Sequence, residues 1–450
     1  MAHAIERDMT KGNPTRHIIA FALPLLIGNL FQQLYNMVDT IVVGKFIGPD
    51  AVASVGTCSS VGFLMFSLSA GIAIGIGIMV AQYFGAGDSE SIRRTIANAI
   101  YVLSVASVIV GVLGIVLAPP ILKLMKTPDH LLADAVTYMR VTCVGIIGIA
   151  AYNGVSAIMR ALGDSRTPIY FLILASIINV VLDLAFVLIF HLGVFGVGLA
   201  TIISQFVSAI TCTIFAYKKI SYFKNLREYM VPQKYYIMKS LSLGIPIALQ
   251  NSLIAISCII LQSVVNSFGA NVMTTFTITG RIEQLIQQPY SSLAMAVTTY
   301  TGQNIGANNI QRVKKGYHRA TIITLIFSLC MLPVAYIFGA SIIRAFVRKE
   351  VVVDLGVQAL RITSLCYFPL GMIYVPRALL NGAGDTRFAM INGITEVACR
   401  IVFANVLTSI PSIGYWGIWI TSGATWTVTA LVCQIRYFSG IWKSKAIMKK

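Results

Sequence analysis

Four carboxylate side chains lie inside stretches of sequence that are otherwise strongly apolar: Asp39, Asp183, Glu283 and Glu396. Asp39, for example, is the one acidic residue in YNMVDTIVVG at 35–44. An ionised Asp at the middle of a membrane helix costs about 2.5–3.5 kcal/mol on insertion scales. A whole folded domain has only about 5–15 kcal/mol of net stability. Such a cost favours a proton or cation site over a purely structural role.

Asp183 has polar neighbours that suit a cation. Asn179 lies four residues earlier, so the two side chains project from one face of a helix, and Thr201 follows a short Gly-rich turn. With Asp39 they supply carboxylate and neutral oxygens, which suit Na⁺. The two carboxylates can equally share one proton, because desolvation and mutual repulsion favour the neutral form of one of them. We therefore predict a site for H⁺ or Na⁺ and for no other metal.

Other polar residues are candidates for binding a substrate. Asn29, Gln33 and Asn36 recur at helical spacing in the same apolar segment as Asp39, and a polar stripe of this kind should face a cleft or other helices rather than lipid. Glu396 and Arg400 are spaced to neutralise each other on one helix, so their pattern favours a packing role at least as much as a binding role. The predicted substrate contacts are Tyr35, Asn36, Gln33, Asn153 and Glu283.

The elements that position these residues are membrane helices. The 450-residue chain is 57% hydrophobic and only 11% charged, with a mean hydropathy of +0.80, whereas soluble domains are about one quarter charged. Several uncharged runs, such as 51–87 and 240–280, exceed the roughly 20 residues needed to span a bilayer. We predict an all-α polytopic membrane protein with twelve transmembrane helices, at about 17–44, 52–82, 95–118, 131–159, 168–190, 195–217, 237–266, 272–301, 317–340, 352–379, 388–408 and 414–437.

The positive charge is concentrated on one face of this topology. Of 34 Lys and Arg residues, 24 lie in the termini, in the loops after the even-numbered predicted helices, or within three residues of the helix ends on that face. By the positive-inside rule, both termini are cytoplasmic, and the first apolar segment is a retained helix rather than a cleaved signal. The net charge of +18 therefore indicates contact with the lipid bilayer and not with nucleic acid. We expect a multi-pass plasma-membrane protein, in a bacterial cytoplasmic (inner) membrane.

The chain contains an internal repeat with an offset of 221 residues. AQYFGAG at 81–87 is echoed by GQNIGAN at 302–308, and LGDSR at 162–166 by AGDTR at 383–387. Because each copy contains an even number of helices, the two lobes share one orientation and are related by a pseudo-two-fold axis along the membrane normal. We predict six-helix lobes at 1–225 and 226–450, with the cation site in the first, because the second lacks counterparts of Asp39 and Asp183.

An enzyme is not expected. The GAGD sequence at 85–88 and NGAGD at 381–385 resemble the GxGD of intramembrane aspartyl proteases, but both fall in basic loops near Arg residues. A turn in which Gly allows tight backbone geometry, while Asp caps a helix or pairs with Arg, explains them better. No Walker A motif is present, so ATP hydrolysis is not expected either.

YNMVDTIVVG, AQYFGAGD with its echo GQNIGANN, RALGDSRTP with its echo NGAGDTR, and INVVLDLAFV together resemble the multidrug and toxic compound extrusion (MATE) transporters. The resemblance implies export of organic, often cationic, compounds by antiport with H⁺ or Na⁺ and without a cofactor. It assigns the cation site to Asp39, Asn179, Asp183 and Thr201. We expect a monomer. A flippase for a lipid-linked or amphipathic molecule is the alternative, although few Arg or Lys lie at helix centres to bind a pyrophosphate lipid.

Overall fold

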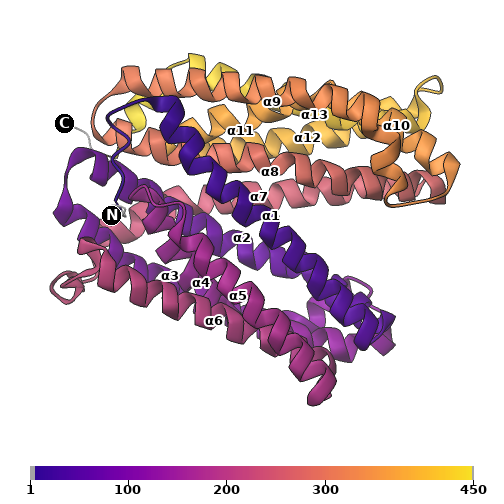
Figure 1. Ribbon diagram of the computed structural model, residues 1–450, viewed down its shortest axis with the longest axis horizontal. Coiled ribbons are helices and arrows are strands. Elements are labelled where there is room, and N and C mark those ends of the chain that lie inside the picture. The colour runs from indigo at the N-terminus through magenta and orange to yellow at the C-terminus, as the bar shows by residue number, and fades with distance from the viewer. Residues whose placement is uncertain (1–5, 448–450) are drawn as a thin grey trace. The chain divides into compact units, whose positions relative to one another are not determined.

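The computed structural model describes residues 6–447, and all regular secondary structure in that range is helical (Figure 1). The first half of the chain forms α1 (Pro14–Phe46), α2 (Pro49–Ala86), α3 (Ser89–Leu124), α4 (Asp129–Ala161), α5 (Thr167–Leu184), a π-helical turn η1 (Ala185–Ile189) and α6 (Gly193–Lys219). The second half forms α7 (Lys234–Asn266), α8 (Ala270–Gly306), α9 (Ile310–Arg344), α10 (Glu350–Ser364), α11 (Tyr367–Gly382), α12 (Arg387–Ser409) and α13 (Gly417–Phe438). Short 3₁₀ turns occupy Ser221–Phe223, Leu226–Tyr229, Gly414–Trp416 and Ile441–Lys445.

Each of the twelve predicted spans coincides with a helix, a helix with its π-turn, or a helix pair. The helices extend beyond the predicted limits: α2 has 38 residues, which corresponds to a length of about 57 Å at 1.5 Å per residue. By length and composition, ten helices in the described range can each cross a bilayer. The chain is a multi-pass membrane protein.

The tenth predicted span is not one helix. It breaks into α10 and α11, which are bent by 47° and together qualify as one span. Pro369 lies in the first turn of α11. A proline lacks the N–H that would bond the carbonyl four residues earlier, so a continuous helix is interrupted there.

By its internal contacts, the chain divides into two compact units. Of the described residues, unit 1 contains 6–8 and 23–248, and unit 2 contains 9–22 and 249–447. The first turns of α7 thus pack within unit 1, where a Cβ on Gly75 would lie 2.6 Å from the backbone nitrogen of Gly244. The first turns of α1 belong to unit 2, where the N–H of the fully buried Met9 donates to Gln303 Oε1 at 2.8 Å.

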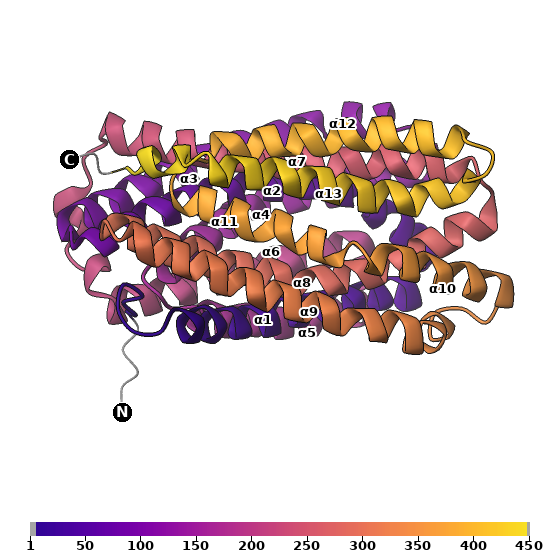
Figure 2. The same cartoon turned by 90° about the horizontal axis from the view of Figure 1, so that it is seen from above.

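Within unit 1, α4 packs against α2, α3 and α6, and α5 packs against α6. Within unit 2, α8 packs against α9, α10 and α11, and α13 packs against α11 and α12, as Figure 2 shows for the neighbouring α12 and α13. The lobe boundary at residue 225, which rests on the repeat, stays a prediction.

The repeated GD sequences form capped turns, as predicted. Asp88 caps α3 by accepting the N–H of Ser91 at 3.0 Å, and the preceding Gly87 has a φ of 74°. Asp164 accepts the N–H groups of Arg166 and Thr167. Its repeat counterpart Asp385 instead pairs with Arg436 across unit 2, with Nε to Oδ2 at 2.8 Å. Asp88 and Asp164 therefore serve helix ends, and Asp385 serves an ion pair with Arg436, which are the two roles predicted for the GD turns.

Candidate cation site

Three helices of unit 1 carry the four residues predicted to bind a cation. Asp39 lies on α1, Asn179 and Asp183 on α5, and Thr201 on α6. Asp183 is the last residue but one of α5, directly before the π-turn η1. A π-turn shifts the register of the helix and is common at functional sites. The short turn at 190–192, followed by Gly193 as the first residue of α6, then brings α6 back alongside α5.

Asn179 links α5 to α6 and α1. We assign its amide so that the nitrogen donates to Asp183 Oδ2 at 3.0 Å and to Tyr35 Oη at 3.1 Å, while the oxygen accepts the Thr201 N–H at 3.2 Å. In the opposite orientation, the amide oxygen would face only acceptors. Asn179 is 1% exposed and Asp183 is 0% exposed, whereas Tyr35, Asp39 and Thr201 are half-buried.

The two carboxyl groups lie against each other. The side chains of Asp39 and Asp183 are close enough to share a hydrogen bond. One oxygen of each, Asp39 Oδ1 and Asp183 Oδ1, is buried and faces no hydrogen-bond donor of the described chain. Two carboxyl groups can bond to each other only when one of them carries a proton, because an ionised carboxylate is an acceptor alone.

Two tyrosines belong to this cluster in ways that the sequence did not reveal. Tyr35, predicted as a substrate contact, lies near both carboxyls and Thr201 and bonds to Asn179. Its spacing of four residues from Asp39 on α1 was the available signal. Tyr138 on α4 also lies near Asp39 and Asp183, and no pattern in the sequence pointed to it. The cluster therefore draws on four helices.

The other predicted substrate contacts in unit 1 lie apart from this network. Gln33 is half-buried and Asn36 is exposed, both on α1. Asn153 lies on α4, half-buried, and its Nδ2 has no hydrogen-bond partner in the described chain. These positions leave all three amides able to bond to a ligand, and their role stays a prediction.

Unit 2 contains a separate charged cluster. The predicted pairing of Glu396 with Arg400 on α12 is confirmed, with Oε1 to Nη2 at 3.1 Å and both side chains buried. Arg400 Nη1 also donates to Cys258 Sγ at 3.1 Å. Glu283 on α8 lies near Arg400 and near Thr363 on α10, and its role as a substrate contact stays a prediction.

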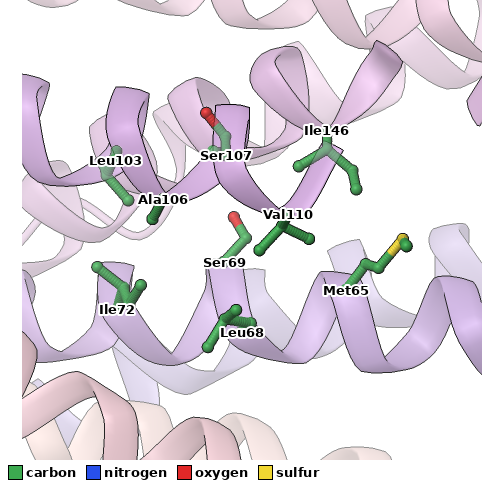
Figure 3. Close-up of a pocket in the computed structure, with 10 residues that line it drawn as sticks. Met65, Leu68, Ser69, Ile72, Leu103, Ala106, Ser107, Val110 and Ile146 are labelled. Carbon is green, nitrogen blue, oxygen red and sulfur yellow. The ribbon is translucent and has the colours of Figure 1, made fainter. Parts of the chain in front are cut away.

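A small cavity in unit 1 is not part of the predicted site. It lies between α2, α3 and α4, and Figure 3 shows Ser69 and Ser107 among lining side chains that are mostly apolar. None of the residues predicted to bind a cation or substrate lines it. Its lining offers two hydroxyl groups and no charge.

The MatE family model matches the chain twice, over residues 24–185 and 246–406. The chain belongs to the MatE family. The two matches begin at Pro24 and Pro246 and fall one in each predicted copy of the repeat. This MatE protein is a transporter and not an enzyme, and the family resemblance drawn from the sequence motifs is confirmed.

Curated relatives cover nearly the whole chain. A probable multidrug resistance protein YoeA of Bacillus subtilis is 26% identical over 99% of this chain and 98% of its own length. A probable multidrug resistance protein NorM of Thermotoga maritima is 25% identical over 97% of this chain and 94% of its own length. These relatives support multidrug export for this MatE transporter and do not favour the flippase alternative.

Solved structures confirm the fold. A MATE in complex with MaL6 matches with a TM-score of 0.91 and 23% identity, covering 99% of this chain and 100% of that one. A transporter of the MOP superfamily from Pyrococcus furiosus matches with a TM-score of 0.90 and 24% identity, covering 98% and 99%. At such identities the likeness establishes the two-lobe, twelve-span fold of this MatE transporter alone.

Proposed function

We propose that this MatE transporter exports organic, cationic multidrug-type compounds by antiport with protons, and that Asp39 and Asp183 carry the coupling proton. The observation behind this proposal is the contact between the two carboxyl groups, each with one buried oxygen that no donor of the described chain reaches. A single proton held between them would remove the repulsion of two adjacent charges in a site of low dielectric constant.

The orientation of Asn179 favours H⁺ over Na⁺. Its amide nitrogen, a donor, points at Asp183, while its oxygen is engaged by the Thr201 N–H. Asp39, Asp183 and Thr201 Oγ1 fit a Na⁺ ion by chemistry, but the fourth proposed ligand, the Asn179 oxygen, is turned away. Binding Na⁺ with all four ligands would require this amide to flip and break its bonds to Asp183, Tyr35 and Thr201.

Coupling follows if proton and substrate favour different states of the protein. Protonation removes one negative charge from the junction of α1, α5 and α6, and deprotonation restores it. The restored charge breaks the hydrogen bond between the carboxyls and changes how these helices pack. A ligand shifts such an equilibrium only by its difference in affinity between the two states, so antiport requires that the exported cation bind the deprotonated form better.

The proposal also includes the substrate contacts, the orientation in the membrane and the oligomeric state. Substrate contacts in unit 1 come from Tyr35, Asn36, Gln33 and Asn153, since amide and phenol groups orient a ligand that is held mainly by apolar surface. Both termini are cytoplasmic by the positive-inside rule, and the transporter acts as a monomer. The two predicted lobes, 1–225 and 226–450, are the parts of the chain that move against each other in alternating access.

Proteoliposomes loaded with a fluorescent organic cation test this function. A pH gradient imposed on the vesicles should drive dye movement, and a Na⁺ gradient at constant pH should not. Asp183→Asn should abolish the response to the pH gradient, whereas Asp134→Asn, at an exposed acid of the same unit, should leave it unchanged. Transport driven by the Na⁺ gradient alone would overturn the choice of ion. Transport by Asp183→Asn at the wild-type rate would overturn the site.

A further inference from the structure

Several buried polar atoms lie between α12 and α13 of unit 2 and take no part in the proposed cation site. The hydroxyls of Thr421, Thr425 and Thr429 on α13 are fully buried and bond to no partner in the described chain. On the same helix, Thr427 bonds to its own backbone in the usual way, with Oγ1 donating to the Gly423 carbonyl at 2.8 Å. A threonine in this helix can therefore bond to the helix backbone, and the three other threonines do not.

These three hydroxyls point towards α12. Trp419 and Gly423 face α8 and α11, where Trp419 Nε1 donates to Thr279 and Gly423 abuts Cys366. Thr421 and Thr425 each follow one of these residues by two positions, which turns them about 200° round the helix, away from α8 and α11. Because α13 also packs against α12, and Asn392 of α12 bonds to the Thr429 carbonyl, the threonine stripe lies on the α12 side.

The facing stripe of α12 is polar at the same spacing. Asn392, Glu396 and Arg400 are four residues apart and all buried. Asn392 Nδ2 donates to the Thr429 carbonyl at 3.3 Å, which fixes the register of this antiparallel pair. One and two turns further along, Glu396 then lies level with Thr425, and Arg400 with Thr421. We call these six residues the polar seam.

The polar seam ends at a cluster with an unbalanced charge. Arg400 Nε and Asn392 Oδ1 are buried without a partner in the described chain, while the Arg400 Nη atoms bond to Glu396 and Cys258. The further carboxylate of Glu283 lies near Arg400, with the neutral side chains of Thr363 and Tyr367 beside it. Glu396 and Glu283 thus lie near the same guanidinium, which forms an ion pair with Glu396 but with no other carboxylate of the described chain, and Glu283 is half-buried.

We propose that the polar seam binds a chain of water molecules and gives protons access to Glu283, which forms a second proton-binding site in unit 2. A buried polar group without a partner carries an uncompensated desolvation cost, and bound water satisfies such groups when several polar partners converge. The hydroxyls, the Asn392 oxygen and the Arg400 Nε supply them. A proton on Glu283 neutralises the remaining charge, and Arg400 stays paired with Glu396.

Infrared pH-difference spectroscopy of the full chain in liposomes tests this proposal. The background carries Asp39→Asn and Asp183→Asn, so that the unit 1 carboxyls cannot contribute. A carboxylic acid band should appear as the pH is lowered, shift in D₂O, and be lost when Glu283→Gln is added. Absence of the band, or its survival in Glu283→Gln, would overturn the site. Loss of the band in Glu396→Gln, with Glu283 intact, would show that Glu396 carries the proton instead of Glu283.

The role of the seam needs a separate variant. Thr425→Val replaces the hydroxyl by a methyl group of similar size, and it should slow deuterium uptake by the acid band several-fold. The matched control, Thr427→Val, removes a hydroxyl that is already bonded and should leave the rate unchanged. Equal rates in both variants would contradict the water chain. No transport is measured, so these outcomes are independent of the proposed antiport.

Discussion

Asp39 on α1 and Asp183 on α5 meet within unit 1, carboxyl to carboxyl, although they are far apart in the chain. Asp183 is fixed by a hydrogen bond from Asn179, which is itself held by the Thr201 backbone on α6. Asp39 receives no such bond from Asn179, while each of the two carboxyls has one oxygen that faces no donor of the described chain. The pair therefore joins α1 to α5, and movement of α1 relative to α5 would separate the two carboxyls.

This contact between the carboxyls predicts what happens when Asp39 can no longer bind a proton. Asp39→Asn should uncouple transport and lower gradient-driven dye export by about tenfold or more, the scale of a typical coupling free energy. The folded state should be retained, because an amide can still bond to Asp183. Export from proteoliposomes and thermal unfolding in detergent would be measured together. Loss of the folded state in Asp39→Asn would show that the residue is needed for packing rather than coupling.

Tyr35→Phe tests whether the tyrosine belongs to the proton site or only contacts the substrate. The substitution keeps the ring and removes the hydroxyl that Asn179 contacts at 3.1 Å, which should cost about 1 kcal/mol. The pH at which export is half-maximal should therefore shift. A change in the apparent substrate affinity with an unaltered pH profile would instead favour the substrate role.

The pairing of Asp385 with Arg436 should matter for the stability of unit 2. Asp385 is nearly buried, with 3% of its side chain exposed, and removing one partner of a buried pair typically costs about 3–5 kcal/mol. Arg436→Ala should lower the unfolding temperature clearly. Glu90→Ala, which breaks a pair whose Glu90 side chain is 62% exposed, should cost no more than about 1 kcal/mol. Equal shifts for both variants would contradict the difference in burial.

The close approach of α2 to the first turns of α7 predicts opposite effects for two glycines of α2. A Cβ on Gly75 would lie 2.6 Å from the Gly244 nitrogen, so Gly75→Ala should destabilise the protein by about 1–3 kcal/mol through overpacking. Gly56 has open space around it, and Gly56→Ala should stabilise the helix by up to about 1 kcal/mol. Thermal unfolding of both variants checks the prediction, and stabilisation by Gly75→Ala would show that the helices can separate there without cost.

The sequence by itself determined the membrane topology, the duplication and the chemistry available to the site. Hydrocarbon thickness sets the length of an apolar span, so ten spans, or eleven with the bent α10–α11 pair, are recognisable by length and composition in the described range. The cost of intramembrane charge singled out four carboxylates, Asp39 and Asp183 among them. The capped GD turns were also predictable, because Gly with positive φ and Asp at a helix start follow local rules.

Only the tertiary structure decided which polar groups meet. The rotation and tilt of each helix depend on its packing against its neighbours. The residue pattern of one helix does not show which face of a neighbouring helix packs against it. For this reason the place of Tyr35 and Tyr138 beside the carboxyls, the direction of the Asn179 amide and the register of the polar seam emerged from the structure. The break before Tyr367 is a different case, because Pro369 is a local signal that the composition of the predicted span does not take into account.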